Sequence, residues 1–346
     1  MMGFSRIILE WYAVNKRDLP WRETREPYFI WLSEIMLQQT RVAQGIPYYM
    51  KFVEAFPSIE DLAAATEGEV LKLWQGLGYY SRARNLHATA KMVAEKYNGI
   101  FPDTYGGLLS LKGVGDYTAS ALASICFNLP EAVVDGNVYR VLARYYGIDL
   151  PINSSAGKRY FKGLAEQVMD VGNIRDYNQG IMEFGAIQCV PKNPDCGACP
   201  LKSDCVALAT NRIDSLPVKA GKTKVRNRYF NYLVLLDGSN KTLLRQRKGS
   251  GIWQNLYEFP LLESEGEIGL EEVERNLSKV VTVEEPAGIY LYNEEKVVHK
   301  LSHQHLHTWF WIVYFDGQLK NSIKLSDLHS YPVPVLIADF INAFKI

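Results

Sequence analysis

The chain has 346 residues, of which 47% are apolar and 12% aromatic. This length and composition predict a globular protein with two packed domains and exclude an intrinsically disordered chain. Its 38 basic and 38 acidic side chains balance, so net charge alone indicates no nucleic-acid partner. No apolar run approaches the roughly twenty residues of a membrane span, and Arg6 and Glu10 interrupt the N-terminal segment where a signal peptide needs an apolar core. We therefore expect a soluble, intracellular protein.

Two kinds of pattern follow one another along the chain. Up to about residue 212, apolar residues recur at helical spacing, as in residues 32–44, 67–75, 117–127 and 137–147. After Pro217 the runs become β-rich and end in turn residues, as in 229–238, 241–248 and 307–317. We expect a helical domain over 1–212, a polar linker over 213–226 and an α+β domain over 227–346.

Charge is unevenly distributed around the second domain. Basic residues gather between Arg212 and Arg228, whereas six glutamates crowd residues 263–274. Each run is either a solvated surface or a surface for a partner, and the sequence leaves both open.

Four of the five cysteines fall in one segment with the spacing C-x6-C-x2-C-x5-C, at Cys189, Cys196, Cys199 and Cys205. Without a secretory signal, a disulfide framework is not expected. Four thiolates can hold a structural zinc ion or a 4Fe-4S cluster, and the spacing alone does not separate the two. The fifth, Cys126, lies in an apolar helical segment and reads as a small buried side chain.

A Gly-x-Gly turn precedes a predicted helix in LLSLKGVGDYTASAL, at Gly113 and Gly115. Such a turn lets backbone N–H groups approach a phosphate, although it is also a common tight connection. Together with VVDGNVYRVLAR and the four-cysteine segment, however, it is far more specific. With LPWR, WLSEIMLQQTRV, GLGYYSRARNLH and YNQGIMEFGAIQC, nearly the whole chain resembles adenine DNA glycosylases of the MutY type, in the helix-hairpin-helix glycosylase superfamily.

The resemblance implies a fold, a cofactor and an activity. It implies a helical helix-hairpin-helix domain in two lobes around a cleft, with a 4Fe-4S cluster on the four cysteines, followed by a Nudix-like domain. It implies a base-excision repair enzyme that hydrolyses the N-glycosidic bond of adenine opposite 8-oxoguanine or guanine in duplex DNA. A monomeric, cytoplasmic protein associated with the bacterial nucleoid, without a membrane partner, is expected.

Two carboxylates are the expected catalytic pair, because N-glycosidic cleavage needs a proton for the leaving base and negative charge near the cationic sugar. Glu34 lies among apolar residues, which would raise the pKa of its carboxyl, although an exposed helical glutamate is the alternative. By resemblance Glu34 protonates N7 of the adenine and later helps activate water. Asp135 would stabilise the sugar, with Asn137 holding the site, while capping a helix is its simpler role.

Tyr117 separates subclasses of the superfamily. Enzymes that also cut the backbone resemble LPGVGRKTA, in which a lysine forms a Schiff base with the sugar. Here LKGVGDYTA places Tyr117 in that slot. The sequence therefore predicts a monofunctional glycosylase, in which Tyr117 packs against the sugar or hydrogen-bonds near the catalytic carboxylate.

Other residues are assigned to DNA by resemblance. The adenine must leave the helix to reach the carboxylates, as it does in glycosylases as a class. Gln39 and Tyr79 would then enter the base stack near 8-oxoguanine, with Leu77 as a wedge beside them, while one of Tyr79 and Tyr80 is an ordinary packing aromatic. A separate set would contact the adenine edge: Arg22 and Gln179, with Glu183 either assisting or purely structural.

In the second domain, Ser302 and His303 match a Phe-Ser-His loop with which the family recognises 8-oxoguanine. Leu301 replaces the Phe and removes its aromatic contact. The alternating histidines of this region are also compatible with a metal site, but no carboxylate or cysteine completes it. The acidic Nudix box is absent from the sequence, so we do not expect nucleotide hydrolysis.

Two rival interpretations are a pyrimidine- or thymine-directed relative and a catalytically silent DNA-binding protein. The second domain with its LSHQHLH segment argues against the first. The joint presence of Glu34, Asp135 and Tyr117 argues against the second.

Overall fold

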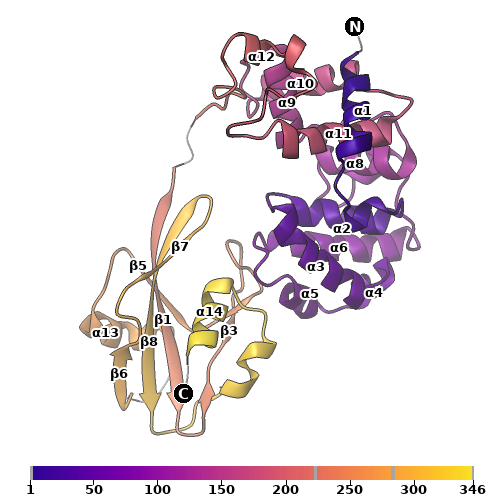
Figure 1. Ribbon diagram of the computed structural model, residues 1–346. Helices are drawn as coiled ribbons and strands as arrows, with labels where there is room; N and C mark the ends of the chain where they lie inside the picture. Colours follow the sequence, from indigo (N-terminus) through magenta and orange to yellow (C-terminus); the bar gives the residue numbers. More distant parts are fainter. Residues whose placement is uncertain (1–2, 222–223, 282–284, 345–346) are drawn as a thin grey trace. The chain divides into compact units, whose positions relative to one another are not determined.

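The computed structural model describes residues 3–221, 224–281 and 285–344. Contacts divide the chain into two units: Met1–Ala64 with Asn85–Gly221, and Ala65–Arg84 with Lys222–Ile346. The first unit is built from helices, and the second contains a β-sheet (Figure 1). The expected linker over 213–226 includes residues 222 and 223, which lie outside the described residues. None of the helices within the described ranges combines the length and apolarity that crossing a membrane requires.

The first unit is mostly α-helical, as its apolar periodicity predicts. The predicted segments 117–127 and 137–147 coincide with helices α8 and α9. The α-helices within this unit are α1 (Phe4–Asn15), α2 (Pro27–Leu37), α3 (Val42–Ala55), α4 (Ile59–Ala64), α7 (Tyr105–Leu109), α8 (Asp116–Phe127), α9 (Gly136–Tyr146), α10 (Ser155–Val168), α11 (Ile174–Glu183) and α12 (Val206–Ala209). Helix α6 (Ser81–Lys96) runs from the second unit into the first.

The segment 32–44 forms two helices instead of one continuous helix. Helix α2 ends at Leu37 and α3 begins at Val42. Between them Gln39 adopts a left-handed conformation with φ 57°, and the Thr40 N–H closes a turn on the Leu37 carbonyl at 3.1 Å. Because Val42 and Ala43 follow Ile35 and Met36 by seven residues, the helical spacing resumes in phase after the polar residues 38–41, and periodicity alone does not reveal the break.

The Gly-x-Gly turn before α8 requires glycine at its first position. Gly113 has φ +76°, and a Cβ there would lie 2.7 Å from Cβ of Asn85. Gly115 then precedes the first turn of α8 in an extended conformation. The turn therefore packs tightly on α6 and leaves the backbone at the start of α8 free of bulky side chains.

The sheet of the second unit has the strand order β5-β1-β8-β6, with β7 also paired to β8. Its two long central strands, β1 and β8, run parallel along their whole lengths. The strands are β1 (Arg226–Asp237), β5 (Leu261–Ser264), β6 (Gly288–Leu291), β7 (Val297–Lys300) and β8 (Gln304–Phe315). The predicted runs 229–238 and 307–317 thus coincide with the sheet centre, whereas 241–248 is divided between two short strands, β2 (Lys241–Thr242) and β3 (Arg245–Gln246). These pair with β9 (Ile323–Lys324) and β4 (Tyr257–Glu258), respectively.

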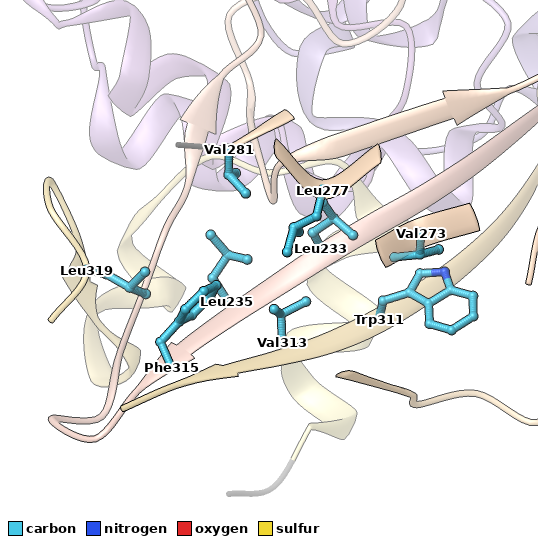
Figure 2. Packing of buried hydrophobic residues seen from close by; sticks show 9 residues of the cluster. All are labelled: Leu233, Leu235, Val273, Leu277, Val281, Trp311, Val313, Phe315 and Leu319. Atoms are coloured by element: carbon cyan, nitrogen blue, oxygen red, sulfur yellow. The ribbon is translucent and has the colours of Figure 1, made fainter. Parts of the chain in front are cut away.

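Each face of this sheet is covered by a helix, because successive side chains on a strand point to opposite faces. Helix α13 (Leu270–Val280) covers one face, where it packs on alternate residues of β1 and β8 (Figure 2). On the other face, Phe310 of β8 stacks on Phe340 of α14 (Val335–Ala343), with ring centroids 4.1 Å apart. The cluster on the α13 face consists of Leu233, Leu235, Val273, Leu277, Val281, Trp311, Val313, Phe315 and Leu319.

The segment Ala65–Arg84 belongs to this second unit, although it precedes the linker by more than a hundred residues. It contains α5 (Glu67–Leu73), which begins at a capping box formed by Thr66 and Glu69. Polar contacts tie it to the C-terminal part of the chain: Asn255 Nδ2 donates to Glu67 Oε1 at 2.6 Å, and Arg84 Nη1 donates to the Gln254 carbonyl at 2.9 Å.

Candidate functional site

A cleft of about 620 Å³ in the first unit brings together the expected catalytic residues. Its walls come from α2, α8, the start of α9, α11 and the short helical turn Pro20–Arg22. The expected site residues that line it are Arg22, Glu34, Gln39, Gly115, Tyr117, Asp135, Asn137, Gln179 and Glu183. Residues separated by up to 161 positions in the sequence therefore share one cavity.

Glu34 is a buried acid on α2. Glu34 is only 9% exposed and lies among buried neighbours such as Trp31 and Ile35. The alternative of an exposed helical glutamate is therefore wrong. Burial raises the pKa of the Glu34 carboxyl to about 7, because a charge is costly away from water. A large fraction of this group therefore carries a proton at neutral pH.

Tyr117, from the first turn of α8, contacts this acid directly. Its hydroxyl donates to Glu34 Oε2 at 2.6 Å and lies 3.2 Å from Sδ of Met182. Burial, together with the charge of Glu34, raises the pKa of the Tyr117 hydroxyl well above its usual value, so the hydroxyl remains a donor. Tyr117 thus orients the acid, the hydrogen-bonding role that the sequence left as one of two options.

Asp135 is partly exposed to the cleft and caps α9. Its Oδ1 accepts from the backbone N–H groups of Asn137 and Val138 at 2.9 and 2.8 Å, and its Oδ2 accepts from Asn137 Nδ2 at 2.8 Å. Burial raises the pKa of the Asp135 carboxyl, while these hydrogen bonds act in the opposite direction. Three N–H donors on two oxygens suit an ionised carboxylate. Capping and facing the cleft are therefore compatible roles.

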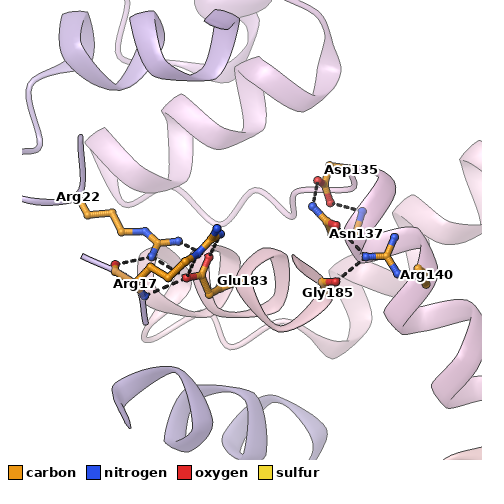
Figure 3. A network of polar contacts seen from close by, with 7 residues as sticks. All are labelled: Arg17, Arg22, Asp135, Asn137, Arg140, Glu183 and Gly185. Atoms are coloured by element: carbon orange, nitrogen blue, oxygen red, sulfur yellow. Dashed lines mark hydrogen bonds and ion pairs between the residues drawn. The ribbon is translucent and has the colours of Figure 1, made fainter. Parts of the chain in front are cut away.

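Asn137 is fixed in turn by Arg140, one turn further along α9. Arg140 Nη2 donates to Asn137 Oδ1 at 2.9 Å and to the Gly185 carbonyl, and its Nε donates to the Cys189 carbonyl at 2.7 Å (Figure 3). A Cβ on Gly185 would lie 2.6 Å from that of Asn137, so only glycine allows this close approach. Arg140 therefore connects the segment of Asp135 and Asn137 to the segment that begins the cysteine cluster.

Glu183 anchors two arginines at the opposite end of the cleft (Figure 3). Arg17 donates from Nη2 to Glu183 Oε2 at 2.6 Å, and Arg22 donates from Nη2 to the same oxygen at 2.8 Å. Burial opposes ionisation, but hydrogen bonds from Arg17 and Arg22 lower the pKa of Glu183 to about 2. Gln179 lies one helical turn earlier on α11 and also lines the cleft. Sequence reasoning missed Arg17, whose only signal is its place in the KRDLPWR stretch.

Tyr79, Ser302 and His303, three of the expected DNA-contact residues of the second unit, line a second cavity, of about 470 Å³. Tyr79 is 45% exposed, adopts a left-handed φ of 49°, and its hydroxyl lies 2.7 Å from Oγ of Ser302. His303 and Leu301 line the same cavity. The structure thus brings Tyr79 and the 301–303 loop together, although more than 220 residues separate them.

The neighbours of Tyr79 are packed. Tyr80 is 6% exposed and its hydroxyl contacts the Val333 carbonyl at 3.5 Å, so Tyr80 is the packing member of the pair. Leu77 is 4% exposed, so its side chain packs inside the unit. Arg82, which the sequence did not single out, lies over the rings of both Trp74 and Tyr79 at 5.4 Å and donates to the Gly78 carbonyl at 3.1 Å.

Three of the four clustered cysteines have hydrogen-bond donors next to their sulfurs. Arg144, itself buried, donates from Nη1 to Cys189 Sγ at 3.4 Å. Burial raises the pKa of the Cys199 and Cys205 thiols, and the charge of Cys189 acts in the same direction, while hydrogen bonds from the backbone N–H groups of Leu201 and Leu208 lower it. Within the described ranges, no three His, Cys, Asp or Glu side chains are placed to hold a single metal ion.

One histidine of β8 makes an aromatic and a polar contact. His307 stacks on Tyr229 at 5.0 Å and lies 3.3 Å from Asn227 Oδ1.

Comparison with known proteins covers both units. Residues 32–166 match the HhH-GPD superfamily of base excision DNA repair proteins, and residues 231–343 match the NUDIX domain. The adenine DNA glycosylase of Buchnera aphidicola subsp. Baizongia pistaciae is 38% identical over 312 residues, covering 90% of this chain and 86% of that protein. The adenine DNA glycosylase of Homo sapiens is 45% identical over 214 residues, or 59% and 39% of the two chains. Among solved structures, a thermostable thymine-DNA glycosylase superposes with a TM-score of 0.56 and 34% identity, over 60% of this chain and 95% of that one.

Proposed function

Because the chain belongs to the adenine DNA glycosylases, base-excision repair enzymes that hydrolyse N-glycosidic bonds, we propose that it removes adenine opposite 8-oxoguanine or guanine in duplex DNA. The observation that carries the proposal is the buried Glu34, held by Tyr117 in the same cleft as Asp135. The relative directed at thymine matches only 60% of the chain, whereas the adenine-directed Buchnera protein matches 90%. This difference favours adenine over a pyrimidine as the target.

Glu34 is the proposed general acid. With a pKa near 7 it holds a proton at neutral pH, yet gives it up readily, which is the balance that general acid catalysis needs. Protonation at N7 turns adenine into a better leaving group. After the base departs, the same carboxylate would accept a proton from the attacking water.

Asp135 is the proposed partner of the sugar. Loss of the base leaves positive charge on the sugar ring, and an ionised carboxylate nearby stabilises it. The three N–H donors on Asp135 support its ionised form, and the position at the N-terminus of α9 favours a negative charge. Asn137 holds the carboxylate in place.

We assign the enzyme to the monofunctional subclass. Tyr117 occupies the slot in which bifunctional relatives carry a lysine, and its hydroxyl is already engaged by Glu34. A phenol cannot form a Schiff base with the sugar. Strand cleavage should therefore require a separate chemical treatment of the product.

Arg22 and Gln179 are the proposed readers of the adenine edge. Glu183 holds Arg22 through two hydrogen bonds, so the guanidinium is oriented before the substrate arrives. The Gln179 amide offers one donor and one acceptor group, which matches the mixed hydrogen-bonding edge of adenine.

Recognition of the opposite base is proposed for the loops that carry Gln39, Tyr79, Ser302 and His303. Gln39 and Tyr79 both stand in left-handed turns, a costly conformation that concentrates at functional sites. The hydrogen bond between Tyr79 and Ser302 holds an aromatic ring, which can stack on a base, next to a hydroxyl, which can hydrogen-bond to it. Recognition of a damaged guanine would use both kinds of contact. The burial of Leu77 makes Tyr79 the better wedge. Gly113 and Gly115 would present backbone N–H groups to a phosphate.

Cys189, Cys196, Cys199 and Cys205 are the proposed ligands of a 4Fe-4S cluster. The donors from Arg144, Leu201 and Leu208 support this assignment because they would offset negative charge on ligating thiolates. Bound there, the cluster would supply structural crosslinking of the segment after α11. A colourless, iron-free protein after anaerobic purification would contradict the assignment of these cysteines to a 4Fe-4S cluster.

The deciding experiment is single-turnover base release from a panel of duplexes. We expect release of adenine opposite 8-oxoguanine, slower release opposite guanine, and no release of thymine opposite guanine. Intact adenine duplexes combined with cleavage of another lesion would overturn the proposal. Tight binding without any release would favour the catalytically silent alternative.

A further inference from the structure

The segment that leads into Asp135 is buried but has no regular structure. Residues 128–134, which connect α8 to α9, form neither helix nor strand, although Ala132, Val133 and Val134 are all buried. Buried backbone N–H and C=O groups need hydrogen-bond partners, which a segment without helix or strand pairing must find elsewhere. Two of the partners of this segment are side chains of the neighbouring helices α11 and α10.

Asn178 of α11 bonds to this segment at two points. Its Nδ2 donates to the Glu131 carbonyl at 2.8 Å, and its Oδ1 accepts from the Val133 N–H at 3.4 Å. Asn178 is only 1% exposed, and both ends of its amide have a backbone partner, so the side chain is held in one orientation. The next residue of α11 is Gln179, which lines the catalytic cleft.

Lys162 of α10 bonds to the carbonyl that lies between these two points. Its Nζ donates to the Ala132 carbonyl at 2.8 Å and to Oγ of Ser120 on α8 at 2.9 Å. The same ammonium lies 3.5 Å from Oδ1 of Asp116, the first residue of α8, and the Lys162 side chain is 21% exposed. Lys162 therefore joins the segment to α8.

The two side chains together hold three consecutive residues, because Glu131 and Val133 bond to α11 while Ala132 bonds to α10. Asp135 follows the last of these bonds by two residues, so a shift of the segment would move its carboxylate in the cleft. A displacement of about 1 Å in a reacting group can reduce a rate by roughly a hundredfold.

We propose that Lys162 and Asn178 are positioning residues that fix the Asp135 carboxylate against the sugar. Neither of them lines the cleft, so each acts through the segment that leads into Asp135 and not on the substrate. This role rests on the proposed function, in which Asp135 stabilises the positive charge of the sugar.

Two measurements on the full-length protein test this role. The first is the single-turnover rate of adenine release at saturating protein. The second compares affinities for two duplexes in which a ring replaces the sugar of the target adenosine: a positively charged pyrrolidine or an uncharged tetrahydrofuran. A well-placed carboxylate favours the charged ring, because this ring resembles the cationic sugar of the transition state. The affinity ratio therefore reports the position of Asp135 without depending on turnover.

Two substitutions remove the bonds. Lys162→Met keeps the length of the side chain and removes its donors, and Asn178→Leu keeps the size and removes both bonds without a change of charge. We expect each variant to release adenine about tenfold more slowly or worse and to lose about threefold or more of the preference for the charged ring. Lys158→Met, one turn earlier on the exposed side of α10, is the matched control and should change neither quantity.

Urea unfolding shows that each variant is folded under the assay conditions. A purely structural role would lower the free energy of unfolding and leave the rate and the affinity ratio of the folded protein unchanged, which would overturn the proposal. A loss in Lys162→Met that Asn178→Leu does not share would also overturn it, since charge and not position would then be responsible. If Asn178→Leu does not fold, Asn178→Ser replaces it, because serine is too short to make both bonds.

The parent protein separates this role from the function on which it rests. A parent protein that releases no adenine would overturn the proposed function. Release by the parent protein, with the same rate and affinity ratio in the variants, would overturn only the role of Lys162 and Asn178.

Discussion

Replacing Glu34 by glutamine should slow base release by orders of magnitude and at the same time stabilise the protein at alkaline pH. Glutamine keeps the size of the side chain and can still accept the hydrogen bond that Tyr117 donates at 2.6 Å. It cannot deliver a proton as an acid. General acid–base catalysis contributes about 10²- to 10⁴-fold, or roughly 3 to 5 kcal/mol at about 1.4 kcal/mol per decade, so the rate should fall by that factor.

The stability change follows from the pKa of Glu34. Its ordinary value is 4.5 and its value in the folded protein is about 7, so between these limits the folded state binds the additional proton. The contribution of Glu34 to the free energy of unfolding is therefore fully present below pH 4.5 and is lost as the pH rises through 7. At pH 8 the buried charge costs about 3 kcal/mol, since each unit of pKa corresponds to about 1.4 kcal/mol. Glutamine avoids this cost.

Two measurements test this reasoning. Single-turnover adenine release at 37 °C reports the catalytic loss, and urea unfolding at pH 5 and pH 8 reports the stability. We expect Glu34→Gln to be more stable than the parent protein at pH 8 and much closer to it at pH 5. Glu10→Gln, at an exposed helical position, is the control and should change neither quantity appreciably. Unchanged turnover, or a stability difference independent of pH, would refute the assignment of Glu34 as a buried acid.

Three further substitutions probe other contacts, two in the cleft of the first unit and one at Tyr79 in the second. Tyr117→Phe removes a hydrogen bond that lowers the pKa of Glu34, so the alkaline limb of the pH–rate profile should move to higher pH; an unmoved limb would contradict the contact. Glu183→Gln leaves Arg17 and Arg22 facing each other without their carboxylate, and should lower the free energy of unfolding by about 3 kcal/mol in urea titrations. Arg82→Lys loses the stacking on Tyr79, and should weaken binding to duplexes containing 8-oxoguanine more than it slows release at saturating protein; equal effects on both would argue for a general folding role.

Local features of the sequence accounted for much of the fold. Helical periodicity and turn glycines predicted α8, α9 and the turn at Gly113, because these depend on residues close in the chain. The same periodicity failed at Gln39, where apolar spacing continues through a left-handed turn. It could not assign Ala65–Arg84 to the second unit, because that grouping depends on contacts such as the one between Glu67 and Asn255, 188 positions apart.

The candidate site was predictable to a similar extent. The apolar surroundings of Glu34 and the capping position of Asp135 could be read from neighbouring residues, and both features are present. The role of Glu183 could not, since its partner Arg17 lies 166 residues away and local sequence does not encode such a pair. Exposure of Tyr79 and burial of Leu77 likewise depend on tertiary packing, since the two residues are almost adjacent in the chain.

The different settings of the two carboxylates lead to a last prediction. Glu34 sits within α2 and depends on Tyr117 from α8, whereas Asp135 depends on the N-terminus of α9, which Arg140 ties to the Cys189 carbonyl. Loss of the Arg140 hydrogen bonds should therefore change the position of Asp135 and leave the position of Glu34 unchanged.

Arg140→Lys keeps the positive charge but removes the planar guanidinium, which donates hydrogen bonds to Asn137, Gly185 and Cys189 at the same time. We expect slower adenine release in single turnover, with the alkaline limb of the pH–rate profile unmoved as long as Asp135 keeps its charge, because that limb reports Glu34, whose pKa the charge of Asp135 raises. Arg144→Lys acts on the cysteine segment without a contact to Asn137, and serves as the comparison. A shifted limb in Arg140→Lys would mean that the two carboxylates are not held independently, and that one framework sets the protonation of both.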